Sequence, residues 1–365
     1  MRSANRRPLS PAAEWSARAA LLVAALLVAF MALELGARLW RGGLHALVHW
    51  PNRIVQRQAQ FDQQVESRFV RDPALGYVPR PNYRSAEFNH DAGGMRVTDP
   101  PAGIAETPPL LATGDSYTYG DEVADGETWP AALQRLVKRR TINAGVNGYG
   151  LDQSVLRTEA VAPAIHPAAI VLSFVADDLT RAEMRHLWGA EKPYFALASD
   201  GSAVLRNVPV PDNPADRTHW SVWQRAFGWS MVIDTIASRL EKDGAWSIGN
   251  VRAMPAGTGA KLACPLMQRL ARLNLPTMVV AQYEPGVWST NVSYREEEHR
   301  LSQHVLDCAK SAGFATFDTF DLLENAVNAN GVKAIYVDQH PSAKGNELIA
   351  TAIADALAKR GMLPQ

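Results

Sequence analysis

The chain has 365 residues, of which 47% are hydrophobic and 20% are charged, and its 37 basic residues balance 37 acidic residues. This ordinary globular composition excludes a wholly disordered chain and a polytopic membrane protein. The zero net charge argues against a bulk nucleic-acid binder, because phosphate contacts need a basic surplus. Two cysteines exclude a disulfide-dense scaffold and a cysteine-rich zinc module.

An apolar run near the N-terminus is the first pattern along the chain. Residues 19–33 are uninterruptedly apolar, and the wider stretch 17–40 carries charges only near its ends, at Arg18, Glu34 and Arg38. Roughly 20 apolar residues cross a bilayer core, and long charged side chains near the ends can reach the interface. We therefore expect one transmembrane helix over residues 17–40.

Two other interpretations of this run are less well supported. A cleaved signal peptide needs a small-residue cleavage site after the run, and no clear one follows it. An amphipathic surface helix needs a polar face, which the run lacks. Arginines flank the run on both sides in similar number, so charge alone does not decide the orientation.

Residues 41–106 read as a connector. Proline recurs through this stretch, with scattered glycine, and such spacing breaks helices and favours extended or turning chain.

From residue 107 onward, short apolar runs alternate with stretches of helical periodicity. The pattern predicts strands over residues 109–113, 141–143, 168–174, 275–282 and 314–317, and helices over residues 129–139, 151–162, 294–312 and 343–360. Strands that alternate with helices indicate βα units and a mainly parallel sheet covered on both faces. Ligands bind such sheets at the carboxyl ends of the strands, so motifs at those ends carry the most weight.

Residues 183–262 interrupt this alternation with an insertion rich in tryptophan. Its chain direction reverses at Asp200-Gly201, which predicts a β-hairpin. The insertion is either a lid or binding surface for sugar or lipid, or an ordinarily packed subdomain.

Three motifs follow predicted strands or precede the last helix. Gly114-Asp115-Ser116 ends the first strand, and the glycine-rich segment 143–150 ends the second, where backbone N–H groups can turn toward an anion. Asp338-Gln339-His340 precedes the last helix. A histidine held by an aspartate and directed at a serine is the geometry of nucleophilic hydrolysis.

In this order the motifs resemble the sequence blocks of the SGNH/GDSL hydrolase family. The four matching segments are residues 114–120, 143–150, 173–178 and 338–340. Segments 72–79 and 94–96 of the connector also look like those of membrane-anchored bacterial members. The resemblance implies a flavodoxin-like three-layer α/β/α sandwich over residues 107–365 and serine esterase chemistry.

The resemblance also implies a role for each motif. Ser116 would be the nucleophile, His340 the general base, and Asp338 the group that orients and stabilises the imidazolium. The N–H groups of Ser116 and Gly148 would hold the oxyanion. A third donor in the family is an asparagine side chain of the third block, and this sequence has Asp177 at that position.

Asp177 is a departure that matters, because an ionised carboxylate only accepts hydrogen bonds and repels an oxyanion. Burial and the adjacent Asp178 could keep Asp177 protonated and able to donate. Asn147 could supply the donor instead, or the protein could have lost hydrolysis. A metal held by the aspartates and His340 has no support in the spacing, and we expect neither a metal nor a cofactor.

Taken together, the resemblance implies a membrane-anchored serine ester hydrolase or O-acetyl transferase that acts on an acylated glycan or lipid. It implies a single-pass protein of the bacterial inner membrane, with residues 1–16 in the cytoplasm and residues 107–365 in the periplasm. The alternative is a catalytically impaired protein of this fold that binds a glycan or serves as a scaffold. Cys264 and Cys308 lie in predicted helices that flank one strand, and they either pair in an oxidising compartment or remain buried thiols.

Overall fold

The computed structural model divides the chain into two compact units. One unit combines residues 1–60 with 217–249, and the other combines residues 61–216 with 250–365. The structure describes residues 10–57, 59, 68–98, 103–211, 220–241 and 243–363.

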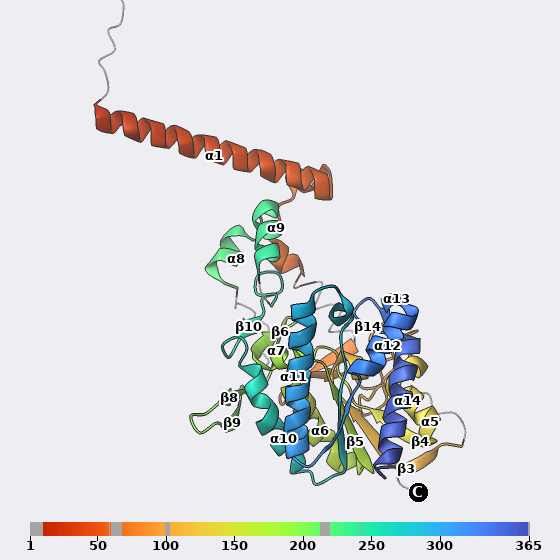
Figure 1. Ribbon diagram of the computed structural model, residues 1–365. Helices are drawn as coiled ribbons and strands as arrows, with labels where there is room; N and C mark the ends of the chain where they lie inside the picture. Colours follow the sequence, from red (N-terminus) through yellow and green to blue (C-terminus); the bar gives the residue numbers. More distant parts are fainter. Residues whose placement is uncertain are drawn as a thin grey trace, which may run out of the picture. The chain divides into compact units, whose positions relative to one another are not determined.

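The second unit contains a parallel five-stranded sheet (Figure 1). Its strands, in spatial order, are β12 (Ala315–Asp318), β11 (Thr277–Ala281), β5 (Ala169–Phe174), β3 (Ala105–Thr113) and β4 (Arg139–Asn143). Numbered by chain order, this is the 2-1-3-4-5 arrangement of flavodoxin-like folds. All six residues of β5 are buried, which explains the continuous apolar run of a central parallel strand.

Helices cover both faces of the sheet, as Figure 1 shows. Contacts group three helices on one face and two on the other. The first group is α6 (Leu151–Ile165), α10 (Ala263–Ala271) and α11 (Val292–Ser311), and the second is α5 (Trp129–Val137) and α14 (Ala343–Lys359). The predicted three-layer α/β/α sandwich is therefore confirmed.

Shorter elements follow the carboxyl ends of the strands and fill the remainder of this unit. They are α4 (Ser116–Tyr119), α7 (Asp177–Ala182), α12 (Phe320–Asn330), α13 (Val332–Ile335), β13 (Tyr336–Val337) and β14 (His340–Pro341). The turn between β13 and β14 carries the last of the three motifs, and α4 carries the first. The topology thus brings the first and last motifs to one edge of the sheet.

The connector is part of this unit from Arg68 onward. Strands β1 (Phe69–Asp72) and β2 (Gly76–Pro79) form an antiparallel hairpin. Further along, the N–H of Arg96 donates to the carbonyl of Asn143 at the end of β4 (2.9 Å). The predicted connector therefore packs against the sheet instead of merely linking it to the N-terminal helix.

The first unit is built on helix α1 (Pro11–Gly42), which is long and apolar enough to cross a membrane and contains an 18-residue window with a mean hydropathy of 2.4. The short helix α2 (His45–Val48) follows it, and α8 (Val222–Phe227) and α9 (Met231–Leu240) complete the unit.

Two charged residues of α1 are buried in contacts with the segment that carries α9. The Glu34 carboxylate accepts the N–H groups of Met231 (2.8 Å) and Val232 (3.1 Å) and the hydroxyl of Ser230 (2.7 Å). Arg38 donates to Glu34 and to the carbonyl of Trp229 (2.5 Å). Glu34 thus satisfies the N-terminal amides of α9, a helix end that attracts anions. The sequence suggested that these two side chains reach toward a membrane interface. In the structure they instead join α1 to the segment that carries α9.

The tryptophan-rich segment expected as one insertion is divided between the two units. The residues on either side of 217–249 belong to the second unit. They form the predicted hairpin of β8 (Tyr194–Leu197) and β9 (Ala203–Arg206), and a small sheet of β6 (Met184–Leu187), β7 (Ala190–Glu191) and β10 (Val251–Arg252). Residues 217–249 themselves belong with α1.

Cys264 of α10 and Cys308 of α11 form a disulfide, with 4.6 Å between their Cα atoms. Of the two alternatives that the sequence left open, the structure adopts the paired one. The disulfide joins two helices of the same layer.

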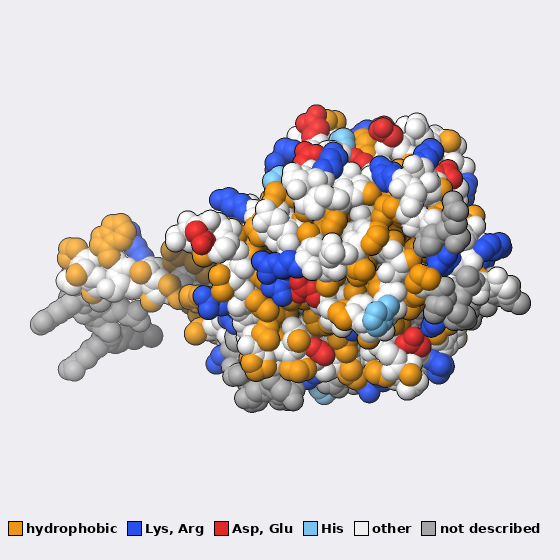
Figure 2. All heavy atoms as spheres, turned by 90° about the horizontal axis from the view of Figure 1, so that it is seen from below, with side chains coloured by type: hydrophobic (Ala, Val, Ile, Leu, Met, Phe, Trp, Pro, Cys, Tyr) orange, Lys and Arg blue, Asp and Glu red, His pale blue; other side chains and the backbone are white. Residues whose placement is uncertain are grey.

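The surface carries charges of both signs. On the face shown in Figure 2, basic and acidic side chains are interspersed among polar and apolar ones, in keeping with the zero net charge. Interspersed charges on this face produce no strong field toward polyanions.

Candidate active site

The loop that carries Ser116 is fixed by its neighbours. Asp115 is the N-cap of α4, and its carboxylate accepts the N–H of Tyr117 (3.0 Å). Gly114 has a φ of 150°, and a Cβ atom there would lie 2.4 Å from the carbonyl of Ser173. Only glycine fits this close approach, so the sequence places Ser116 at the carboxyl end of β3 in one conformation.

The structure brings Ser116 and His340 together from opposite ends of the domain. The Oγ of Ser116 lies 2.9 Å from the Nε2 of His340. With the ring proton on Nδ1, the serine hydroxyl donates this bond to Nε2. The pair has the geometry needed for a histidine to take the proton of an attacking serine.

Tyr117 locks the turn that carries His340, and sequence reasoning did not single it out. Its hydroxyl donates to the carbonyl of Gln339 (2.6 Å), and its ring centroid lies 5.2 Å from that of His340. Burial raises the pKa of Tyr117, so its hydroxyl stays neutral and remains a donor. Tyr117, which directly follows Ser116, therefore helps to fix the position of His340.

The two nitrogens of His340 face different partners. While Nε2 meets Ser116, Nδ1 lies 3.3 Å from a carboxylate oxygen of Glu122, a residue that sequence reasoning missed. Asp338 is exposed and has a φ of 48°. Among the described residues it makes neither a hydrogen bond nor an ion pair, so the structure does not bring the predicted acid to His340.

The loop after β4 holds the predicted oxyanion glycine. Gly148 has a φ of 74°, and a Cβ atom there would lie 2.9 Å from the Trp188 ring and 3.0 Å from the Tyr77 hydroxyl. The carbonyl of Asn147 accepts the Tyr77 hydroxyl (2.7 Å). These contacts fix the loop and exclude a side chain at position 148. The roles of the Gly148 N–H and the Asn147 side chain stay predictions.

Asp177 is paired with a cation. Its carboxylate accepts the Nε–H of Arg181, one helical turn later (2.9 Å), and 39% of its side chain is exposed. None of the explanations considered from the sequence included this partner. The pair offsets the negative charge at the position where the family places a neutral donor.

Arg181 also holds two buried aspartates. Its Nη1 donates to Asp178 (2.9 Å) and to Asp115 (3.2 Å). Burial raises the pKa of Asp178, reinforced by the Asp115 carboxylate, and burial also raises the pKa of Asp115 against the effect of Arg181. A guanidinium therefore lies among the carboxylates that a metal site would have needed.

An open pocket of about 610 Å³ lies beside Glu122. Connector residues form most of its wall together with two acidic residues that follow α4. The lining residues are Arg68, Tyr83, Ser85, Ala86, Glu87, Phe88, Asp121 and Glu122. The segment expected to be a linker thus borders the site.

Comparison with known families gives one match that covers most of the domain. Residues 112–348 match the sequence model of the GDSL-like lipase/acylhydrolase family. This range contains Ser116, Gly148, Asp177 and His340. No curated protein matches the chain.

Solved structures with a similar fold share little sequence with this chain. A putative lipolytic protein of the G-D-S-L family from Desulfitobacterium hafniense is 15% identical, with a TM-score of 0.37, over 69% of this chain and 100% of its own. Axe2, an acetylxylan esterase from Geobacillus stearothermophilus, is 14% identical, with a TM-score of 0.38, over 70% and 96%. A lipase/acylhydrolase from Enterococcus faecalis is 14% identical, with a TM-score of 0.34, over 70% and 97%. Because these TM-scores lie below 0.5, the family assignment rests on the sequence match alone.

Proposed function

The chain belongs to the GDSL-like lipase/acylhydrolase family, and we propose that it is a serine ester hydrolase or O-acetyl transferase with Ser116 as nucleophile. The observation that carries this proposal is the 2.9 Å contact between Ser116 Oγ and His340 Nε2. A serine and a histidine that lie 224 residues apart in the chain meet in the orientation that acyl transfer requires.

The proposed reaction has two halves. His340 takes the Ser116 proton while Oγ bonds to the ester carbonyl carbon, and the oxyanion forms against the N–H groups of Ser116 and Gly148. The intermediate collapses to an acyl-serine, and the leaving alcohol takes the proton from His340. Water or an acceptor hydroxyl then bonds to the acyl carbon while His340 takes its proton. The bond from this carbon to Ser116 Oγ breaks, Oγ takes the proton back from His340, and the acid or the new ester leaves.

A carboxylate beside Nδ1 stabilises the imidazolium in both halves. The sequence pattern assigns this part to Asp338, and Glu122 is the carboxylate that lies near Nδ1 in the structure.

We further propose that α1 is a retained membrane anchor. Its length and hydropathy suit a bilayer. A cleaved signal sequence would not be expected to carry the contacts that join Glu34 and Arg38 to the segment around α9. Retention can be tested by N-terminal sequencing of the mature protein from membranes, and a mature chain that begins after Gly42 would contradict it.

We propose that the protein resides in the inner membrane and that residues 107–365 lie in the periplasm, for which there is independent support. The Cys264–Cys308 disulfide is typical of proteins outside the cytoplasm. An acylated glycan or lipid of the cell envelope is then the substrate class that an anchored esterase would meet. Cleavage by protease added to spheroplasts would support this location, and protection of the domain would contradict it.

The experiment that tests the activity uses the full chain in detergent. We expect Ser116-dependent labelling by a fluorophosphonate and turnover of p-nitrophenyl acetate, both lost in Ser116→Ala. Labelling that persists in Ser116→Ala would place the reactive residue elsewhere. Absence of both labelling and turnover in the wild type would favour the alternative, a glycan-binding or scaffolding protein of this fold.

A further inference from the structure

We propose that Glu122, and not Asp338, is the positioning carboxylate for His340. This inference rests on the proposed function of Ser116 and His340 and assigns the third member of their catalytic group. It is carried by the geometry at Nδ1, the backbone conformation at position 122 and the contacts that hold the surrounding loop.

The Nδ1 atom of His340 is the ring nitrogen that a positioning carboxylate would contact. Nε2 is taken up by Ser116, and Nδ1 is buried without a well-aligned hydrogen bond among the described residues. The Oε1 of Glu122 lies 3.3 Å from Nδ1. A small rotation of the Glu122 side chain would align this contact, and catalytic hydrogen bonds are often poorly aligned before substrate binds.

The backbone at position 122 indicates a role for the side chain. Glu122 has a φ of 68°, in the left-handed region that glycine adopts freely and other residues adopt at a cost of about 1–2 kcal/mol. Non-glycine residues in this region cluster at functional sites, where the surrounding structure holds them. A glutamate here is explained if its carboxylate is needed beside His340.

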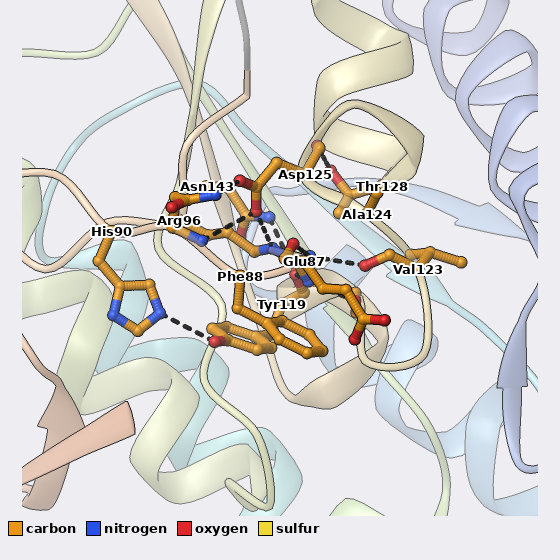
Figure 3. Close-up of polar contacts among 12 residues, drawn as sticks. Glu87, Phe88, His90, Arg96, Tyr119, Val123, Ala124, Asp125, Thr128 and Asn143 are labelled. Atoms are coloured by element: carbon orange, nitrogen blue, oxygen red, sulfur yellow. Dashed lines mark hydrogen bonds and ion pairs between the residues drawn. The ribbon is translucent and has the colours of Figure 1, made fainter. Parts of the chain in front are cut away.

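One buried arginine of the connector holds the loop on both sides of Glu122. Figure 3 shows Arg96 directed into this loop, with contacts to Val123 and Asp125. Arg96 donates to the carbonyls of Tyr119 (2.8 Å), Gly120 and Val123 (2.6 Å), and to the carboxylate of Asp125 (2.9 Å). Because carbonyls before and after Glu122 bind the same guanidinium, the position of Glu122 is fixed by the fold.

The start of this loop is also anchored to the nucleophile. The N–H groups of Gly120 (2.8 Å) and Asp121 (3.2 Å) donate to the carbonyl of Ser116. Glu122 therefore follows directly from the turn that ends α4, and the nucleophile and the carboxylate share one rigid segment. His340 is inserted between the two ends of that segment.

Asp338 shares the left-handed backbone, with a φ of 48°, but it lacks the other two features. It lies exposed in the turn between β13 and β14, and no described residue pairs with its carboxylate. Glu122 is also exposed as a residue, so the two carboxylates differ in their partners: that of Glu122 lies 3.3 Å from Nδ1 of His340. The side chain of Glu122 is 29% exposed and that of His340 is 16% exposed.

In the reaction, Glu122 would stay ionised throughout. The Ser116 proton moves to Nε2, and Nδ1–H donates to Glu122, which stabilises the resulting imidazolium without taking the proton. The carboxylate also selects the tautomer in which Nε2 is free to accept. Glu122 thus acts through His340 and does not touch the substrate ester.

The test compares Glu122→Gln with Asp338→Asn in the detergent-solubilised full chain, since each variant removes one negative charge near the same histidine. For Glu122→Gln we expect kcat for p-nitrophenyl acetate to fall on the order of 10²–10⁴-fold, with KM nearly unchanged. The rising limb of the kcat/KM profile should move to lower pH, because a less stabilised imidazolium loses its proton more easily. Glu122→Asp should recover part of the activity. A large loss and the same shift in Asp338→Asn, with Glu122→Gln close to wild type, would overturn the proposal.

A second measurement does not depend on turnover. The pKa of His340, followed by NMR of histidine-labelled protein and assigned with His340→Gln, should fall in Glu122→Gln more than in Asp338→Asn. If the wild type neither turns over nor labels, the proposed function fails while this titration still tests the pairing. An unchanged His340 pKa in Glu122→Gln would contradict the pairing itself. Glu122→Gly relieves the left-handed backbone, so its midpoint of thermal unfolding should equal or exceed that of the wild type.

Discussion

The Nε of Arg181 lies 2.9 Å from a carboxylate oxygen of Asp177. The residue that replaces the expected oxyanion asparagine is therefore ion-paired with an arginine of the same helix. This relationship changes what the substitution means. An unpaired carboxylate would oppose an oxyanion, whereas a paired one removes a donor while adding little net charge.

We predict that Asp177→Asn raises kcat. The asparagine restores an N–H donor, and the gain should not exceed the 10²–10³-fold typically lost with one oxyanion donor, because Arg181 already offsets the charge that the substitution removes. Steady-state hydrolysis of p-nitrophenyl acetate measures the effect, and the double variant with Ser116→Ala should abolish it. A fall in kcat would mean that the Asp177–Arg181 pair contributes directly to the site.

Replacing Arg96 should disturb both stability and catalysis. Arg96→Lys keeps the charge but loses the planar fork that binds several carbonyls and Asp125 together, so we expect about 3 kcal/mol lower free energy of unfolding. Urea unfolding measures the loss, and kcat should fall more than KM changes. Arg84→Lys, at an exposed position of the same connector, is the control and should stay within about 0.5 kcal/mol.

The contact between α1 and α9 can be tested by hydrogen exchange. Glu34→Gln removes the charge that accepts two amides and a hydroxyl at the start of α9, so the local opening free energy should fall by about 1–3 kcal/mol. Exchange at residues 230–233 should accelerate. Glu14→Gln changes an exposed carboxylate of the same helix and should leave this exchange unaltered.

Reducing the disulfide should lower stability substantially. Cys264 and Cys308 lie 44 positions apart in the chain, and the chain-entropy relation gives about 4 kcal/mol for a loop of this length. The variant Cys264→Ala/Cys308→Ala should show this loss in urea unfolding without reductant. Dithiothreitol should then lower the stability of the wild type and leave the variant unchanged. Identical unfolding of wild type and variant would contradict the prediction.

Glu298 should make stability depend on pH in a defined window. Burial raises the pKa of this carboxyl to about 8, and the nearby carboxylates of Glu284 and Asp177 add to the effect. The folded state therefore keeps its proton up to about pH 8, while the unfolded chain loses it near 4.5, so stability falls as pH rises between these values. Glu298→Gln should be more stable than wild type at pH 8.5 and equal to it at pH 4. Equal pH slopes for the two proteins would argue against this carboxyl as the source.

Much of the domain could be read from the sequence because its signals are local. The buried strands and the helices between them depend on neighbouring residues, so the pattern predicted a mainly parallel sheet covered on both faces. The resemblance to the SGNH/GDSL family then implied the three-layer sandwich. Ser116 and His340 were predicted as site residues because each lies in a motif that ends a predicted strand or precedes a predicted helix, and their side chains lie 2.9 Å apart in the structure. The match of residues 112–348 to the family agrees with this.

The remaining features depend on contacts between distant parts of the chain. No pattern in the sequence around Glu122 predicts a left-handed residue whose carboxylate lies beside His340. The sequence pattern assigned this role to Asp338, because it lies only two residues before His340. Arg96 lies in a proline-rich stretch that reads as a linker, although its guanidinium is buried against the nucleophile loop. Similarly, Glu34 and Arg38 lie near the end of an apolar helix and were therefore expected at the edge of a membrane span. Their contacts could not be predicted, because the partners lie about 200 residues later in the chain.

The Glu34 contact has a consequence for any form of the protein that lacks helix α1. A cut after Gly42 would remove both Glu34 and Arg38 from the unit that contains α9. The first amides of α9 would lose their acceptor, and the unit would lose the helix on which it is built. Loss of α1 would therefore leave the segment around α9 open to unravelling and proteolysis, although the chain still joins that segment to the α/β domain on both sides. The folding of this segment thus depends on the presence of α1.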